Sequence, residues 1–384
     1  MYICISAMGL PSKENPGYGI FEFDQAKALA SINNKVIYAA LDTRSFKHRR
    51  KYGFLTYTEE NVLVYSLNVP LGGIPSRFNN EFFSAIYGRV QLLLFNYLMH
   101  RVIKKEGIPD IFHSHFLDVS SYTSRYCRHH HFPLVITEHW SLLNNDNVPR
   151  YIIKTAKDTY RYSLDRLCVS TSFAKQLLKV TGFDFKVIPN IVSTEDFFYQ
   201  PSSHRTGFFS FVSCGSLAYG KGHDVLIRAF KNVHDTYHNC DLKIIGGGRE
   251  LKQLRELSHS LSLQDCVSFC GVLQRDKISA LFNDSDVFVL ASRGETFGVV
   301  FIEAMATGLP VIGTICGGPE DFITQENGIL VPRDDVESLS NAMVSMIERI
   351  KEYDKESIAR TAKALFSPER VANQLMQVYS SLIY

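Results

Sequence analysis

Short apolar runs alternate with amphipathic segments along the first half of the chain. The amphipathic segments, such as FEFDQAKALASI, have the spacing of helices that bury one face. Strands separated by helices of this length indicate βαβ units, and nearly continuous apolar strands indicate a parallel sheet covered on both faces. The predicted strands occupy residues 2–7, 35–41, 62–67, 111–116, 133–139, 166–171 and 185–190.

The pattern begins again after the polar segment QPSSHRTG at 200–207, which we interpret as a linker. The two series predict two doubly wound, Rossmann-like α/β domains, at residues 1–200 and 201–367. Ligands of such sheets bind outside the carboxyl ends of the strands, so we expect the domains to face each other across a cleft. The predicted strands of the second series occupy residues 208–217, 241–248, 266–273, 286–292, 310–314 and 328–332.

The composition narrows the class of protein. A length of 384 residues suits two domains, and a formal charge of +2 gives no support for a nucleic-acid partner. The first residues lack the pattern of a secretory signal, and no run approaches the roughly 18 apolar residues of a membrane-spanning helix. The eight cysteines are scattered without a CxxC pair, so we expect free, reduced thiols and a cytoplasmic location.

The segment SRGETFGVVFIEAMATGLPVIGT at 292–314 carries the strongest chemical signal. A strand ends, a polar loop carries Glu295, and a helix of about three turns is predicted from near Phe297 to Gly308. The free N–H groups of its first turn form an anion site. Glu295 and Glu303 suit the binding of sugar hydroxyls. The alternative is a capping glutamate and an ordinary solvated one.

A second signal is the glycine-containing loop in SCGSLAYGKGHDVLIRAF at 213–230. Lys221 lies between Gly220 and Gly222, directly before a helix predicted to begin near His223, and it can reach an anion. The loop is not a P-loop, because a glycine follows the lysine. A surface lysine in a turn, with Asp224 as a helix cap, is the alternative.

A third loop, NPGYGIFE, carries Gly17 and Gly19 ahead of a predicted helix. It comes close to the dinucleotide fingerprint, but it lies too far from the strand and lacks the third glycine, which disfavours an NAD enzyme. We expect this loop to approach a phosphate or an acceptor from the opposite domain.

Two strand ends are rich in histidine. We expect His113, His115, Glu138 and His139 to point at a ligand, because the ends of adjacent parallel strands converge. A metal site on the three histidines is a less favoured alternative, and the histidines at 129–131 suit a polar helix end. Asp284-Ser285-Asp286 suits capping rather than a D-x-D metal motif. The segment 84–100 suits a buried crossover helix, with a membrane-surface helix as the alternative.

Taken together, these segments resemble the retaining glycosyltransferases of family 4, which have the GT-B fold. The segment PNIVSTEDF at 189–197 and the terminal SPERVANQLMQVYSSLI extend the resemblance over nearly the whole chain. Its most specific element is Glu295-x7-Glu303, followed by A-x-A-x-G-x-P-V-I. The resemblance also implies that the last helix, at 368–384, crosses back onto the N-terminal domain.

For the donor, the resemblance implies that Glu303 binds the ribose hydroxyls and that Glu295 contacts the transferred sugar. The backbone N–H groups of Phe297, Gly298 and Val299 would meet the diphosphate or the sugar. Many relatives carry an arginine where this chain has Ser216, and we consider Arg249 or Arg293 as substitutes.

For the reaction, the resemblance implies that Lys221 neutralises the leaving diphosphate and that His139 lies near the reacting centre. The loop of Gly17 and Gly19 would close over donor phosphate and acceptor. We therefore expect no metal and no cofactor beyond the nucleotide sugar, because a lysine and a helix dipole supply the positive charge.

The expected function is transfer of a sugar, with retention, from a nucleotide diphosphate sugar to a hydroxyl of a glycan or a lipid-linked acceptor. A UDP-sugar is the expected donor, and surface polysaccharide or glycan assembly is the expected setting. Peripheral contact of the N-terminal domain with the inner face of the cytoplasmic membrane fits this setting. The alternatives are a sugar-nucleotide epimerase of the same fold and a non-catalytic nucleotide-sugar-binding protein.

Overall fold

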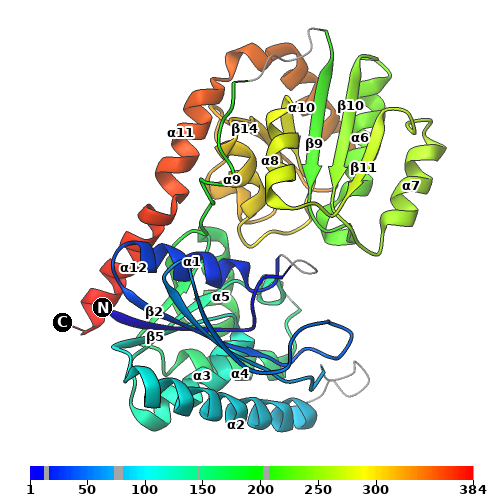
Figure 1. The fold of residues 1–384 in the computed structure, drawn as a ribbon. Coiled ribbons are helices and arrows are strands. Elements are labelled where there is room, and N and C mark those ends of the chain that lie inside the picture. The colour runs from blue at the N-terminus through cyan, green and yellow to red at the C-terminus, as the bar shows by residue number, and fades with distance from the viewer. Residues whose placement is uncertain (13–16, 73–80, 146, 202–206, 384) are drawn as a thin grey trace. The chain divides into compact units, whose positions relative to one another are not determined.

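The computed structural model describes residues 1–12, 17–72, 81–145, 147–201 and 207–383, with only the backbone of 81 and 82. The chain forms two compact units, one of Met1–Ile191 with Pro368–Tyr384 and one of Val192–Ser367 (Figure 1). The segment interpreted as a linker, 200–207, lies mostly outside the described residues. The first unit thus ends before residue 200, and the second includes the chain on both sides of that segment.

The first unit contains an eight-stranded sheet in the order β3-β4-β2-β1-β5-β6-β7-β8. All neighbouring strands are parallel except β3 and β4, which are antiparallel. The strands are β1 (Tyr2–Ala7), β2 (Lys35–Asp42), β3 (Gly53–Glu59), β4 (Val62–Asn68), β5 (Ile111–His115), β6 (Leu134–Glu138), β7 (Asp165–Cys168) and β8 (Lys186–Val187). Its helices are α1 (Ile20–Ser31), α2 (Glu81–Glu106), α3 (Leu117–His130), α4 (Arg150–Tyr160), α5 (Thr171–Thr181) and α12 (Pro368–Ile383).

The sequence did not predict strand β3. It is an edge strand whose side chains are mostly exposed, so it lacks the apolar run by which the inner strands were recognised. The strand predicted at 185–190 is short for a related reason, because only Lys186 and Val187 pair at the other edge.

Helix α12 completes the core of the first unit, although more than 170 residues separate it from the other elements of that unit. Val371, Ala372, Leu375 and Tyr379 are fully buried in one apolar cluster with residues of α1 and of the central strands. Figure 1 shows α12 lying alongside α1. The last helix is therefore a structural part of the unit formed by the start of the chain.

Helix α2 crosses between β4 and β5. Phe95, Leu98 and Met99 are fully buried, which confirms the predicted crossover helix for that face. The opposite face leaves Leu93 68% and Tyr97 49% exposed. In the part of the chain that the structure describes, no helix is long and apolar enough to cross a membrane.

The second unit contains a six-stranded parallel sheet in the order β11-β10-β9-β12-β13-β14. The strands are β9 (Phe209–Cys214), β10 (Cys240–Ile245), β11 (Val267–Gly271), β12 (Val287–Val289), β13 (Val311–Thr314) and β14 (Gly328–Val331). The helices are α6 (His223–His234), α7 (Leu251–Ser260), α8 (Arg275–Asn283), α9 (Val299–Ala306), α10 (Val336–Arg349) and α11 (Lys355–Phe366). All eight cysteines are free, as their scattered spacing predicted.

Helix α9 is shorter than predicted. It spans eight residues from Val299, because Gly298 has a φ of 98° and a left-handed residue cannot belong to a right-handed helix. At the other end Gly308, with a φ of 83°, follows the last turn as the sequence predicted. The loop between β12 and α9 is correspondingly longer and includes Phe297.

We predict that Leu375→Ala destabilises the protein strongly. Leu375 is fully buried between α12 and α1, and a buried Leu→Ala change costs about 2–5 kcal/mol. Thermal and urea unfolding measure the loss. Gln377→Ala, on the exposed face of the same helix, is the matched control and should be nearly neutral. Equal stability of the two variants would contradict the packing of α12 described above.

Candidate functional site

In the second unit, the loop after β9 positions Lys221. This residue ends a short 3-10 helix, Tyr219–Lys221, and its aliphatic chain lies against Gly215. Gly222 has a φ of 63°, and a Cβ there would lie 1.9 Å from the carbonyl oxygen of Ala291. Only glycine therefore fits where this loop passes the end of the neighbouring strand.

Lys221 and Glu295 are partners of each other. The Nζ of Lys221 lies 2.5 Å from Oε1 of Glu295, and the hydroxyl of Ser292 donates to the same oxygen at 2.7 Å. The side chains are 26% and 9% exposed. The main chain of Glu295 forms a parallel bridge with Gly317, which fixes the loop. The structure thus brings together two predicted site residues that are 74 positions apart.

Glu303 lies close to the same place. It is half-buried on α9. Burial raises the pKa of the Cys214 thiol at the end of β9, the carboxylate of Glu303 raises it further, and the charge of Lys221 lowers it. Since both charges act on one thiol, Glu303 and Lys221 lie near the carboxyl end of the same strand.

The backbone before α9 leads into the N-terminus of the helix. Gly298 is the N-cap residue of the helix and forms no side-chain cap. The side chain of Phe297 is buried in an aromatic cluster with Phe322 and Phe366, so it anchors the loop while Gly298 and Val299 form the helix start. A helix N-terminus with free N–H groups favours an anion.

Arg293 does not replace the missing arginine at position 216. Its guanidinium donates to Asp224 at 2.9 and 3.0 Å and to Asp334 at 2.6 Å, and it lies 3.9 Å from the centre of the Tyr219 ring. Burial tends to raise the pKa of Asp224, but the hydrogen bond and charge of Arg293 outweigh it and lower that pKa. Arg293 therefore holds the loop through its two carboxylate partners. Asp224 is one of these partners and does not act only as a helix cap. Ser216 and Arg249 are exposed.

The first unit holds the other predicted loop, of Gly17 and Gly19. Gly19 has a φ of 73°, and a Cβ there would lie 2.4 Å from the carbonyl oxygen of Gly9. A Cβ on Gly17 would meet nothing within 4 Å, so packing requires glycine only at position 19. The Tyr38 hydroxyl donates to the carbonyl of Gly9 at 2.7 Å and ties the loop to β2.

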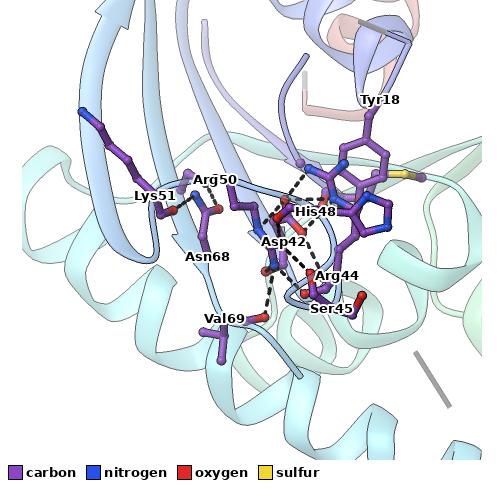
Figure 2. Close-up of polar contacts among 12 residues, drawn as sticks. Tyr18, Asp42, Arg44, Ser45, His48, Arg50, Lys51, Asn68 and Val69 are labelled. Carbon is purple, nitrogen blue, oxygen red and sulfur yellow. Dashed lines mark hydrogen bonds and ion pairs between the residues drawn. The ribbon is translucent and has the colours of Figure 1, made fainter. Parts of the chain in front are cut away.

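A cluster of charged residues after β2 was not recognised from the sequence. The guanidinium of Arg44 donates to both carboxylate oxygens of Asp42 and lies 3.6 Å from the centre of the Tyr18 ring (Figure 2). Arg50 pairs with Asp42 at 3.0 Å and donates to the carbonyls of Arg44 and His48. The signal was an acidic residue at the end of a buried strand, followed by a basic segment.

The three strand-end histidines form a buried network. Nδ1 of His115 lies 3.1 Å from Nε2 of His139. The ring of His113 lies tilted against that of His115, with their centres 4.3 Å apart, and His113 hydrogen-bonds the hydroxyls of Thr137 at 2.7 Å and Tyr379 at 2.6 Å. The expectation that His113 points at a ligand is therefore wrong, because both of its nitrogens are used internally.

Glu138 also differs from the expectation. Its carboxylate accepts the N–H groups of His139 and Trp140, both at 2.9 Å, and the hydroxyl of Tyr160 at 2.6 Å. Burial raises its pKa to about 7. Glu138 is thus a fully buried anchor for the turn that carries His139. Nδ1 of His139 is buried and has no hydrogen-bond partner among the described residues.

Several expectations about other polar residues hold. His129 and His130 end α3, and His131 is its left-handed C-cap. Asp286 accepts the N–H of Ser210 at 2.9 Å and Asp284 pairs with Lys243, so both have structural roles. Within the described ranges, no group of three or more His, Cys, Asp or Glu side chains has the arrangement of a metal site.

Two family models match the chain in succession. One, described as Glycosyltransferase Family 4, matches residues 26–196, and the other, described as glycosyl transferases group 1, matches residues 195–363. The chain belongs to this family of glycosyltransferases. Mannosylfructose-phosphate synthase from Agrobacterium fabrum is 33% identical over 190 residues, which are 46% of this chain and 42% of that protein. The chain thus matches less than half the length of this relative.

Solved structures agree on the fold. Sucrose-phosphate synthase from Thermosynechococcus elongatus has a TM-score of 0.81 at 20% identity, covering 99% of this chain and 98% of that chain. HepE from Anabaena, in complex with UDP-glucose, has a TM-score of 0.73 at 17% identity and covers 99% of both chains. The two parallel α/β sheets therefore have the predicted GT-B fold.

The buried histidine network should make the stability of the folded protein depend on pH. Burial lowers the pKa of His113 to about 3, with the nearby His139 adding to the effect, and burial alone lowers that of His139 to about 3. In the unfolded chain both titrate near the ordinary value of 6.5. Stability from this network is therefore fully present above about pH 6.5 and is lost as the pH falls toward 3.

NMR of ring-labelled histidines measures the pKa of each ring directly. The signals of His113 and His139, assigned with the variants His113→Asn and His139→Asn, should not shift between about pH 7.5 and pH 5. A titration of either signal centred near pH 6.5 would show that the network is hydrated and not buried as described.

Proposed function

We propose that this protein is a retaining glycosyltransferase that moves a sugar from a nucleotide diphosphate sugar to a hydroxyl of an acceptor. The observation that carries the proposal is the ion pair of Lys221 and Glu295 in the loops beside β9, with Glu303 of α9 near enough to raise the pKa of the Cys214 thiol at the end of that strand. Membership of the family supports the reaction class. HepE, which shares the fold, binds UDP-glucose, and this supports a UDP-sugar as the donor to test first.

In the proposed mechanism, the diphosphate of the donor displaces Glu295 from Lys221. The ammonium group of Lys221 then faces the phosphates, together with the N–H groups of Phe297, Gly298 and Val299. Glu295 becomes available for the hydroxyls of the transferred sugar, and Glu303 binds the ribose. These fixed charges stabilise the leaving diphosphate without reorganisation during the reaction.

The bond between the anomeric carbon and the leaving phosphate oxygen breaks with oxocarbenium character. The acceptor oxygen then bonds to the anomeric carbon from the same face, and its proton passes to the leaving phosphate. We propose that His139, whose Nδ1 has no hydrogen-bond partner among the described residues, orients groups near the anomeric carbon. The loop of Gly17 and Gly19 is proposed to approach the donor phosphates. Since Lys221 and the helix start supply positive charge, this mechanism requires no metal.

For the acceptor, we propose a hydroxyl of a glycan, free or lipid-linked, in surface polysaccharide or glycan assembly. The exposed apolar side chains of α2, among them Ile86 and Leu93, support peripheral contact with a membrane surface. Lys104 and Lys105 near the end of the same helix would favour an anionic leaflet such as the cytoplasmic one.

We predict that Lys221→Ala lowers the rate of sugar transfer by about 100-fold or more, because removal of one preorganised charge-stabilising group has effects of this size. The free energy of unfolding should change by less than about 2 kcal/mol, because the lysine is partly exposed. Release of UDP from UDP-sugars, measured with and without an acceptor mixture, gives the rate.

Lys252→Ala, which removes an exposed lysine of α7, is the control and should keep full activity. An unchanged rate in Lys221→Ala would remove this lysine from the mechanism. Conversion of UDP-N-acetylglucosamine without any acceptor would identify an epimerase instead, and tight binding without UDP release would identify a binding protein.

We predict that Glu303→Ala weakens UDP binding by about tenfold to 100-fold, because it removes charge-assisted hydrogen bonds to the ribose. Isothermal titration calorimetry with UDP measures the Kd. Glu256→Ala, an exposed carboxylate of α7, should bind UDP like the wild type. If Glu303→Ala also retains wild-type affinity, the ribose lies elsewhere.

A further inference from the structure

A pocket of about 980 Å³ lies within the first unit. Its walls come from α2, α3 and α4, and from the segments that follow β1, β2 and β6. This volume is at the upper end of the range for small-molecule sites, so it has room for a ligand larger than one sugar ring. Tyr18 and Trp140 line the pocket. They are the sequence neighbours of Gly19 and His139, two of the predicted site residues.

The lining of the pocket is more positive than the protein as a whole. The chain is nearly balanced, with 41 basic and 39 acidic residues. The pocket wall has two carboxylates, Asp118 and Asp158, against five cations, which are Arg44, Arg125, Arg128, Lys154 and Arg161. Asp42, which lies outside the lining, already neutralises Arg44. The remaining positive charge is concentrated on α3, on α4 and just after α4.

Three arginines carry most of this charge. Arg125 and Arg128 are three positions apart on α3 and so lie on one face of the helix, and Arg161 directly follows α4. All three side chains are exposed, and no ion pair joins any of them to a carboxylate that the structure describes. Guanidinium groups in this state are suited to bidentate binding of phosphate or carboxylate.

The opposite wall leaves room for Arg125. Gly88 lies in the interior of α2, where glycine is unfavourable for a helix. A Cβ at this position would lie 3.7 Å from Nη1 of Arg125, in ordinary contact. Any larger side chain would therefore meet the guanidinium and crowd the space between α2 and α3.

The rest of the lining suits a saccharide. Tyr87, Tyr122, Tyr151 and Trp140 present aromatic surface to the pocket. The hydroxyl of Tyr87 shares a 2.7 Å hydrogen bond with Thr43, which fixes its ring. Aromatic faces bind the apolar faces of sugar rings, while the polar groups between them bind hydroxyls.

We propose that this pocket is the acceptor site and that the acceptor is a saccharide bearing an oxyanion, phosphate or carboxylate, held by Arg125, Arg128 and Arg161. The inference rests on the proposed function, because it assigns the acceptor class of the same reaction. Its charge and shape are nevertheless properties of the first unit alone, so binding can be tested without any donor.

The test uses the only tryptophan of the chain, Trp140, as the reporter. Its fluorescence is titrated with glucose 6-phosphate, glucuronate, a short-chain prenyl diphosphate-linked glucose in detergent, neutral glucose and inorganic phosphate. Calorimetry confirms each Kd. We expect at least one anionic saccharide to bind about tenfold more tightly than either glucose or inorganic phosphate, because it satisfies both the aromatic and the arginine parts of the pocket.

The double variant Arg125→Gln/Arg128→Gln should weaken the binding of that saccharide by about tenfold and leave glucose binding unchanged. Lys157→Gln, which removes an exposed cation of α4 that does not line the pocket, is the matched control and should bind like the wild type. Raising the ionic strength should weaken only the anionic ligands.

The outcomes distinguish a soluble anionic acceptor from a lipid-linked one. They also test the acceptor site separately from the donor site. Tightest binding of glucose 6-phosphate or glucuronate indicates a soluble or polymeric anionic glycan, and tightest binding of the prenyl-linked sugar indicates a lipid-linked acceptor. The proposal is overturned if glucose binds as tightly as every anionic saccharide, if the double variant binds like the wild type, or if no saccharide binds up to about 20 mM, well above a millimolar Kd. If calorimetry shows no binding of UDP to the wild-type protein, the donor assignment in the second unit is wrong, and the acceptor proposal is unaffected.

Discussion

In the second unit, the ammonium group of Lys221 and the carboxylate of Glu295 neutralise each other at 2.5 Å, and the surrounding loops hold the two side chains in this contact. The two residues meet because Gly222 lets one loop pass against the carbonyl of Ala291, and because Arg293 ties the same loop to Asp224 and Asp334. In the proposed mechanism, an entering diphosphate replaces the carboxylate of Glu295 as the partner of the lysine. The released carboxylate is then free for the hydroxyls of the transferred sugar, as proposed above.

The strand-end histidines of the first unit form an uncharged network, in contrast to the ion pair of the second unit. The ring of His139 contacts His115, which packs against the tilted ring of His113, and the hydroxyl of Tyr379 hydrogen-bonds His113. Since burial lowers the pKa of each ring, the network remains uncharged at neutral pH. The predicted site residues thus differ in charge between the units, since those of the second unit form an ion pair and the histidine of the first unit is uncharged.

The sequence predicted the two α/β series and the loops of Lys221 and Glu295, because buried parallel strands and glycine turns leave strong local signals. It missed β3, whose edge position removes the apolar pattern, and it placed the start of α9 too early, because the left-handed Gly298 is not visible in composition. It could not foresee that His113 faces a helix 266 positions away or that Arg293 is already paired. Such pairings depend on which residues the fold brings together, and local spacing does not encode that.

The late position of α12 bears on how the protein is made. A ribosome releases residues 1–191 well before residues 368–383. The apolar surface that α12 covers in the folded protein is therefore not covered by α12 while the second unit is synthesised. During this interval the hydroxyl that holds His113 is also missing. The histidine geometry of the first unit therefore cannot be complete until α12 has been translated.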